Sequence, residues 1–290
     1  MLLTDLLDEY LMECQIKGYS DLTIKHTKLN IQKFINETGL TEVESVRPVH
    51  IKQYIVKRQE SGIKAVTINT QVKHIRCMYK YAVSEGILST NPFDRIPFLK
   101  EQKPMIKTYS FEDIKQIINY FNGKDFLSIR NKTMMMTFIE TGIRSSELRN
   151  IRVDDIYEDS IRIIGKGNKV RFVAISLPLR KQMIRYQRVR NSVLGDKNCE
   201  WYYISKTGKY LKIGAMKHII EKLYELDLPV QPTFHNFRRF YAQQMLGHVD
   251  LYTVSRLLGH SDVVTTQRYV NSTEDKVIIE RGMNSPLSNM

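Results

Sequence analysis

The sequence is poor in cysteine and has no long apolar run. Its 290 residues include only Cys14, Cys77 and Cys199, an odd number without a CxxC spacing. We therefore expect reduced thiols and neither a disulfide framework nor a zinc site built on cysteine pairs. No segment reaches the roughly 18 consecutive apolar residues of a membrane span, and the amino terminus carries acids where a secretory signal carries bases. These absences exclude a membrane protein and predict a cytoplasmic one.

Motifs for nucleotides and metals are also missing. The chain has no GxxxxGK[ST] phosphate loop, so nothing in the sequence indicates the use of ATP. Several histidines lack the spacing of metal ligands, namely His26, His50, His74, His218 and His248. We expect no metal, no ATP and no other cofactor.

Positive charge is what the sequence has in excess. The 44 Lys and Arg outnumber the 31 Asp and Glu, which gives a formal net charge of +13. A polyanion is the first partner to consider, although a solvated lysine-rich surface has the same composition. Residues 1–45 carry four basic and eight acidic residues, whereas residues 46–105 carry eleven basic and four acidic ones. If a polyanion binds, the first helical segment should face away from it and the later segments should surround it.

The spacing of apolar residues predicts a helical amino-terminal domain. Apolar residues from Leu2 to Leu11 recur at spacings of three and four, in a helix that Gly18 ends, and further helices are expected after Ser20, from Pro48 and over residues 67–86. Four short helices of this kind make a small bundle over residues 1–90.

A proline-rich segment follows the bundle. Pro92, Pro97 and Pro104 lie among basic and polar residues, so a helix cannot continue through them. We expect residues 91–107 to be an interdomain linker and residues 108–273 to form a second domain.

The second domain is expected to be mainly helical with one strand pair. Helices are expected near residues 110–122, 128–141, 177–191, 213–226, 235–246, 250–258 and 262–269. Within residues 160–176, β-branched runs flank a Gly-Lys-Gly-Asn tetrapeptide, which is the signature of a β-hairpin.

Polar residues recur at short spacings in the second domain. TGIRSSEL contains Arg144 and Glu147, FHNFRR contains His235 and Arg238, and LLGH ends at His260. Taken singly, each has a simple structural interpretation, such as an ion pair at a helix start or a polar pair on one helical face. Tyr269 is one of 16 tyrosines and has no special standing by itself.

The order and spacing of these motifs together resemble the tyrosine recombinases, the phage integrase family that includes the Xer proteins. The matches are the arginine of TGIRSSEL, a lysine of the GKGNK hairpin, the HxxR pair, the LLGH turn and a tyrosine nine residues later. Residues 67–93 look like the last helix and exit of the family's core-binding domain, and residues 201–209 look like the segment before its HxxR helix. The resemblance therefore covers nearly the whole chain.

The resemblance implies a fold and a set of catalytic residues. The fold is an α-helical, SAM-like core-binding bundle followed by a mixed α/β, mainly helical catalytic domain of the DNA breaking-rejoining type with a small antiparallel sheet. The catalytic residues are Arg144, Lys166, His235, Arg238, His260 and the nucleophile Tyr269. Glu147 matches an acidic position of the family and is expected to orient neighbouring side chains.

Physical chemistry explains why these residue types belong together. A phosphodiester repels nucleophiles and gathers negative charge in its transition state, so fixed cations and hydrogen-bond donors are needed. Arg144 and Arg238 can bind the nonbridging oxygens bidentately, and His260 adds a donor, without a metal. The phenol of Tyr269 has a reference pKa of about 10 and needs activation, for which the resemblance offers His235 as the proton acceptor.

The leaving 5′ oxygen needs a proton, and the resemblance gives that role to Lys166. A glycine-flanked hairpin tip is slender enough to enter a minor groove. Lys169 remains the rival, and a solvated turn lysine is the non-catalytic interpretation. Arg239 departs from the family, in which a histidine commonly follows the second catalytic arginine.

The resemblance implies a site-specific recombinase that cuts and rejoins double-stranded DNA. It would act as a homotetramer through a 3′-phosphotyrosyl intermediate and a Holliday junction, in the nucleoid, with accessory DNA-bending or directionality factors as further partners. Residues 274–290 form a tail that we expect to be exchanged between protomers, with packing on its own domain as the alternative. Two other functions stay open, a type IB topoisomerase and a non-catalytic DNA-binding accessory protein.

Overall fold

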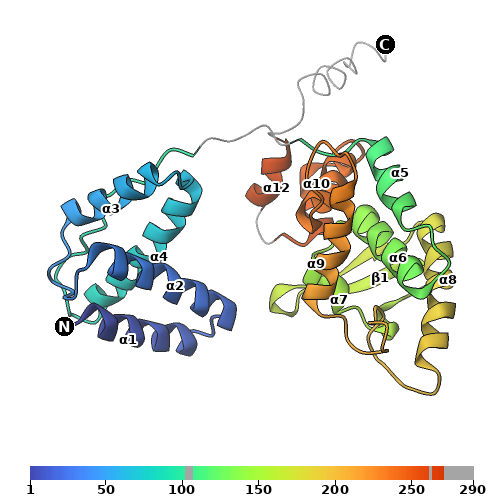
Figure 1. The fold of residues 1–290 in the computed structure, drawn as a ribbon, viewed down its shortest axis with the longest axis horizontal. Coiled ribbons are helices and arrows are strands. Elements are labelled where there is room, and N and C mark those ends of the chain that lie inside the picture. The colour runs from blue at the N-terminus through green and yellow to red at the C-terminus, as the bar shows by residue number, and fades with distance from the viewer. Residues whose placement is uncertain (102–106, 261–262, 271–290) are drawn as a thin grey trace, which may run out of the picture. The chain divides into compact units, whose positions relative to one another are not determined.

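The computed structural model describes residues 1–101, 107–260 and 263–270. The chain divides into two compact units, Met1–Pro104 and Met105–Met290, each with its own hydrophobic core (Figure 1). Helices dominate both, and the strands of the described ranges form one two-stranded antiparallel sheet. The expected helical first domain and mainly helical second domain with a small antiparallel sheet are therefore confirmed. Among the described helices, none is both long and apolar enough to cross a membrane.

The described part of the first unit is a bundle of helices. Its members are α1 (Leu3–Ile16), α2 (Asp21–Thr38), α3 (Pro48–Glu60) and α4 (Ala65–Ser84). Local signals in the sequence set their ends: the Ser20 side chain accepts the Thr23 N–H at the start of α2, and Gly39 ends that helix in a left-handed conformation. Pro48 occupies the first turn of α3, where its missing N–H costs nothing.

Aromatic side chains fill the core of the first unit. Phe34 is fully buried and meets Tyr54 and Phe93 edge to face, with ring centroids 5.2 and 5.9 Å apart. Phe93 and Ile96 come from the segment after α4, so the chain returns to the bundle there before it leaves. Arg76 on α4 donates to the Ile96 carbonyl and holds this return in place.

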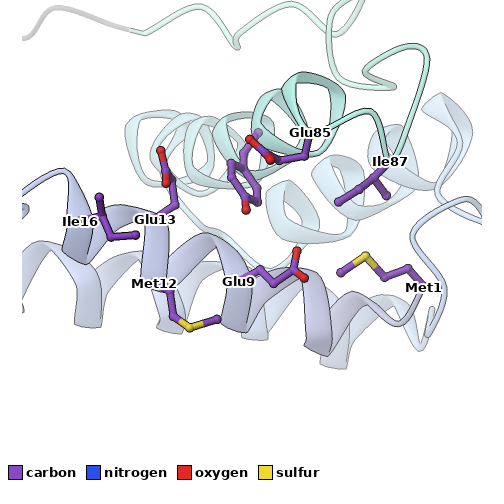
Figure 2. Close-up of a pocket in the computed structure, with 8 residues that line it drawn as sticks. Met1, Glu9, Met12, Glu13, Ile16, Glu85 and Ile87 are labelled. Carbon is purple, nitrogen blue, oxygen red and sulfur yellow. The ribbon is translucent and has the colours of Figure 1, made fainter.

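The acidic amino-terminal segment lines a hollow in the first unit (Figure 2). The hollow has a volume of about 550 Å³, and it is lined by Met1, Glu9, Met12, Glu13, Ile16, Tyr81, Glu85 and Ile87. Three of these side chains carry carboxylates, in a protein whose formal net charge is +13. A surface of this charge repels phosphate groups.

The second unit contains the remaining described elements. In chain order they are α5 (Phe111–Tyr120), α6 (Phe126–Thr141), α7 (Ser145–Arg149), η1 (Val153–Asp155), β1 (Ser160–Ile164), η2 (Lys166–Asn168), β2 (Val170–Ala174), α8 (Leu177–Leu194), α9 (Ile213–Lys222), η3 (Leu223–Glu225), α10 (Phe234–Met245), α11 (Leu251–Leu258) and α12 (Val263–Val270). The expected hairpin is present, with Ile161 opposite Val173 and Ile163 opposite Arg171. The expected tail, residues 274–290, lies outside the described residues.

Helix α6 is the centre of the second unit and packs against α5, α8 and α10 (Figure 1). It is apolar on most sides, and Met134, Met135 and Phe138 are fully buried. The helix ends at Gly142, whose φ of 59° is left-handed and whose missing Cβ would lie 2.4 Å from Cδ1 of Tyr241. The left-handed backbone of Gly142 turns the chain towards α7, which begins at Ser145, and the missing side chain leaves room for Tyr241.

Candidate active site

Arg144 and Glu147 form the first part of the site, at the start of α7. The carboxylate of Glu147 accepts the backbone N–H of Arg144 at 2.8 Å and its Nη1 at 2.9 Å. The Glu147 side chain is 3% exposed, whereas that of Arg144 is 40% exposed. One side of the Arg144 guanidinium is therefore fixed to protein while much of it faces solvent.

Arg171, which is outside the motifs discussed above, binds the same carboxylate from β2. Its Nη1 and Nη2 donate to Oε1 and Oε2 of Glu147 at 3.0 and 2.7 Å, a bidentate pair, and its side chain is 12% exposed. A signal for it exists in the sequence. Alternation along the strand places Arg171 on the same face as the buried Val173, and an inward-facing arginine needs hydrogen-bond acceptors within the protein.

Glu147 is ionised despite its burial. Burial raises the pKa of this carboxyl, but hydrogen bonds from Arg171 and from the Arg144 backbone outweigh it and lower the pKa to about 2. The group therefore supplies a full negative charge between two guanidinium groups.

Arg238 on α10 joins the ends of two other helices. Its Nη1 donates to the carbonyl of Gly142 at 2.8 Å and its Nη2 donates to the carbonyl of Leu258 at 2.7 Å. The residue is 4% exposed. The second arginine of the motif is thus anchored far more deeply than Arg144.

His260 lies at the turn that ends α11. Gly259 is left-handed with φ of 67°, and the His260 N–H donates to the Ser255 carbonyl at 3.0 Å, so the LLGH motif forms a glycine-capped helix end. Nδ1 of His260 lies 2.7 Å from Oγ1 of the buried Thr266 on α12. This contact links the turn to the helix that carries Tyr269.

Both histidines of the motif are held in the neutral state. Burial, followed by the charges of Arg238 and Arg144, lowers the pKa of His260 to about 4. Desolvation by its surroundings lowers the pKa of His235, whose ring is partly exposed, and the charges of Arg239 and Arg238 add to this effect. Hydrogen bonds bring Arg144, Glu147 and Arg238 to the end of α11, where His260 lies, and His235 is on α10 with Arg238.

The structure describes Lys166 and Tyr269 only through their backbone. Lys166 begins the η2 turn between the two strands, which the Gly165 N–H closes by donating to the Lys169 carbonyl at 2.8 Å. A Cβ on Gly165 would lie 3.5 Å from Oε1 of Glu147, so the base of the hairpin adjoins the charged cluster. Because the Lys166 side chain is not among the described parts, the preference for Lys166 over Lys169 stays a prediction.

Tyr269 belongs to α12, which packs against α10 and α11. Its backbone is therefore placed next to the elements that carry Arg238 and His260. The role of its phenol as nucleophile stays a prediction, since its side chain lies outside the described structure. Arg239, the departure from the family pattern, donates to Oδ1 of Asn236 at 3.3 Å.

A charge cluster of this kind can bind and polarise an anion. The guanidinium groups of Arg144 and Arg238 provide donors, and the imidazoles are neutral and can exchange protons or hydrogen bonds. In residues 1–101, 107–260 and 263–270, no group of three or more His, Cys, Asp or Glu side chains is arranged to hold a metal ion.

Comparisons with known proteins show the family to which the chain belongs. The model of the phage integrase family matches residues 107–276, and that of the phage integrase SAM-like domain matches residues 2–103. Tyrosine recombinase XerC of Leptospira interrogans is 25% identical over 272 residues, which cover 90% of this chain and 86% of the relative.

Two solved structures share the fold. The recombinase XerH, bound to a palindromic difH substrate after cleavage, aligns with a TM-score of 0.76 at 16% identity over 93% of this chain and 82% of that one. The lambda integrase tetramer bound to a Holliday junction aligns with a TM-score of 0.74 at 16% identity over 93% and 77% of the two chains. At these identities the likeness concerns the fold alone.

The glycine of LLGH should be intolerant of a side chain. A Cβ on Gly259 would lie 2.8 Å from Nη1 of Arg171, and left-handed backbone costs a non-glycine residue about 1–2 kcal/mol. We expect Gly259→Ala to lower the free energy of unfolding of the second unit by at least about 1 kcal/mol, measured by urea unfolding followed through the single tryptophan, Trp201. Gly214→Ala is the matched control, because nothing lies within 4 Å of its Cβ position in α9, and it should not destabilise. Equal destabilisation by both would contradict the prediction.

The pKa of His260 gives a second prediction. An NMR titration of the DNA-free protein, with the His260 signal identified through His260→Gln, should show a midpoint near 4 instead of the usual value of about 6.5. A bound phosphate mimic such as vanadate should raise the midpoint, because an anion favours the charged imidazole. A midpoint near 6.5 without the anion would show that the ring is not desolvated beside the arginines.

Proposed function

Because the chain belongs to the phage integrase family, we propose that it is a tyrosine recombinase that breaks and rejoins double-stranded DNA at specific sites. The observation that carries the proposal is the convergence of Arg144, Arg238 and His260 on the end of α11. Helix α12, which contains Tyr269, begins shortly after that turn. This convergence supports a phosphate clamp, formed by Arg144, Arg238 and His260, next to the helix of the proposed nucleophile.

In the proposed reaction the clamp receives the scissile phosphate. Arg144 and Arg238 neutralise its nonbridging oxygens and bind them more tightly as negative charge grows in the transition state. The neutral His260 contributes a hydrogen bond, and its contact with Thr266 fixes the orientation of the ring. Arg238 and His260 are held in place before the substrate arrives, so little reorganisation of these two groups accompanies the reaction.

Bond making and proton transfer complete the step. The phenolic oxygen of Tyr269 attacks the phosphorus while the bond to the 5′ oxygen breaks, which gives a 3′-phosphotyrosyl link and a free 5′ hydroxyl. His235 accepts the phenolic proton, a role that suits an imidazole whose lowered pKa leaves it neutral. Lys166 gives a proton to the leaving oxygen. The bond energy is conserved in the phosphotyrosine, so the reaction needs no ATP, and the arginines take the place of a metal in neutralising the phosphate.

Rejoining to a different strand makes the reaction a recombination. Two rounds of cleavage and transfer pass through a Holliday junction within a homotetramer. The likeness to the lambda integrase tetramer on such a junction supports this assembly. The enzyme would act on DNA in the cytoplasm, at the nucleoid, and accessory bending or directionality factors would set the outcome.

A covalent adduct tests the proposal. The wild-type protein should attach to a nicked duplex carrying the site that it selects from random-sequence DNA, and denaturing gel electrophoresis should resolve the adduct. Tyr269→Phe should abolish the adduct, whereas Tyr252→Phe, on exposed α11 surface, should not. An adduct that survives Tyr269→Phe would refute the nucleophile, and no adduct from wild type would favour an accessory DNA-binding protein. Relaxation of any supercoiled plasmid, without the site, would favour a type IB topoisomerase.

A substrate with a better leaving group tests the general acid. Lys166→Ala should slow cleavage of ordinary DNA by about 100-fold or more, and a 5′-bridging phosphorothiolate should restore much of the rate, because a thiolate leaves without a proton. Single-turnover cleavage measures both rates, with Lys169→Ala as the matched control two residues beyond the tip glycine. Rescue of Lys169→Ala in place of Lys166→Ala would reverse the assignment.

A further inference from the structure

We propose that Arg171 is a positioning residue for DNA cleavage, which fixes Glu147 and the turn at the end of α11 and so places Arg144 and His260. The inference rests on the proposed function for the reaction that is measured. Its structural basis is the set of contacts that Arg171 makes with α7 and α11 from the neighbouring strand β2.

The carbonyls at the end of α11 show how the turn is held. The last carbonyls of a helix have no partner within it and carry the negative end of its dipole. Five consecutive ones are satisfied here: Ser255 by the His260 N–H at 3.0 Å, Arg256 by the Gly259 N–H at 3.0 Å, Leu257 by Nε of Arg171 at 2.9 Å, Leu258 by Nη2 of Arg238 at 2.7 Å, and Gly259 by Nη2 of Arg144 at 3.4 Å. The backbone cap satisfies two of them, and three different arginines satisfy the other three.

The three arginines differ in how firmly they are held. Arg144 makes the longest of these bonds and its side chain is 40% exposed, so a phosphate oxygen can replace the Gly259 carbonyl as its partner. Arg171 is 12% exposed, and its Nε, Nη1 and Nη2 all donate to protein acceptors at 3.0 Å or less. It therefore acts on substrate through its neighbours.

Arg171 also balances the charge of Glu147. Oε1 of Glu147 accepts from Arg144 at 2.9 Å and from Arg171 at 3.0 Å, so the two guanidinium groups share one carboxylate. Without Arg171 the whole charge of that buried carboxylate would act on Arg144 and hold it against transfer to a phosphate. The Leu257 carbonyl would lose its partner at the same time, which frees the turn that positions His260.

Lysine cannot take over this role. The planar guanidinium of Arg171 donates through Nε to the Leu257 carbonyl and through Nη1 and Nη2 to both oxygens of the Glu147 carboxylate. An ammonium is a compact charge on a flexible stem and cannot span both acceptors with a fixed geometry. Retaining the charge is therefore insufficient to keep Arg144 and His260 in place.

The test compares Arg171→Lys and Arg171→Gln with wild type, each as the full chain. Single-turnover cleavage of the nicked site at saturating protein and well below the unfolding temperature should fall by roughly 100-fold, as expected when reacting groups shift by about 1 Å. DNA affinity should change by less than about threefold, because Arg171 faces protein and one contact carries little of non-specific binding. The 5′-bridging phosphorothiolate should not rescue either variant, since the defect is in holding the phosphate and not in protonating the leaving oxygen.

Arg190→Lys is the matched control for loss of a buried arginine. Arg190 is 5% exposed in the same unit and donates to the carbonyls of Tyr202, Cys199 and Trp201, in the segment after α8. It should lower the unfolding midpoint and leave the cleavage rate of the folded protein within about threefold of wild type. Urea unfolding of all variants separates stability from rate.

The outcomes distinguish the two proposals. A wild type that cleaves, with Arg171 variants that cleave within threefold of it, overturns the positioning role and leaves the proposed function intact. A loss of rate that Arg190→Lys matches, or that the phosphorothiolate repairs, overturns it as well. A wild type that forms no adduct overturns the proposed function and the inference with it.

Discussion

Guanidinium groups repel one another, so they gather in one place only where negative charge holds them. In this protein the charge comes from Glu147, a carboxylate that is 3% exposed and accepts from both Arg144 and Arg171. The partial negative charge at the end of α11 supplies the rest. The sharp turns at Gly142 and Gly259 bring the chain close enough for these contacts. The three arginines of the cluster are thus held by hydrogen bonds to the Glu147 carboxylate, to the carbonyls at the end of α11, or to both.

This arrangement gives the cluster fixed and exchangeable parts. Arg238 is 4% exposed and bonded to the carbonyls of Gly142 and Leu258, so it belongs to the framework as well as to the proposed clamp. Arg144 faces solvent with much of its side chain. A phosphate that enters would meet one arginine that is already in place and one that can turn towards it.

Features that depend on neighbours in the chain could be predicted from the sequence. The cap at Ser20, the proline at the start of α3 and the hairpin around Gly165 follow from residues within a few positions of one another. The pairing of Arg144 with Glu147 is also local, since three residues separate them.

Features that depend on distant segments could not be predicted in the same way. The contact from Arg171 to Glu147 joins residues 24 apart, and that to the Leu257 carbonyl joins residues 86 apart. They form only once the hairpin register has turned Arg171 inward and α11 has packed against β2. The spacing of motifs identified the charged residues that meet substrate in the proposed reaction, but not the one that holds them in position.

The hairpin combines local turn geometry with a contact to a distant segment of the chain. Its base at Gly165 adjoins Glu147, whereas its turn is closed by a hydrogen bond from the Gly165 N–H to the Lys169 carbonyl within the hairpin. Gly167 and Asn168 both adopt left-handed backbone there, which shapes the turn from within. The tip can therefore vary, and with it the proposed reach towards a DNA groove, under constraints separate from those on the residues of the proposed phosphate clamp.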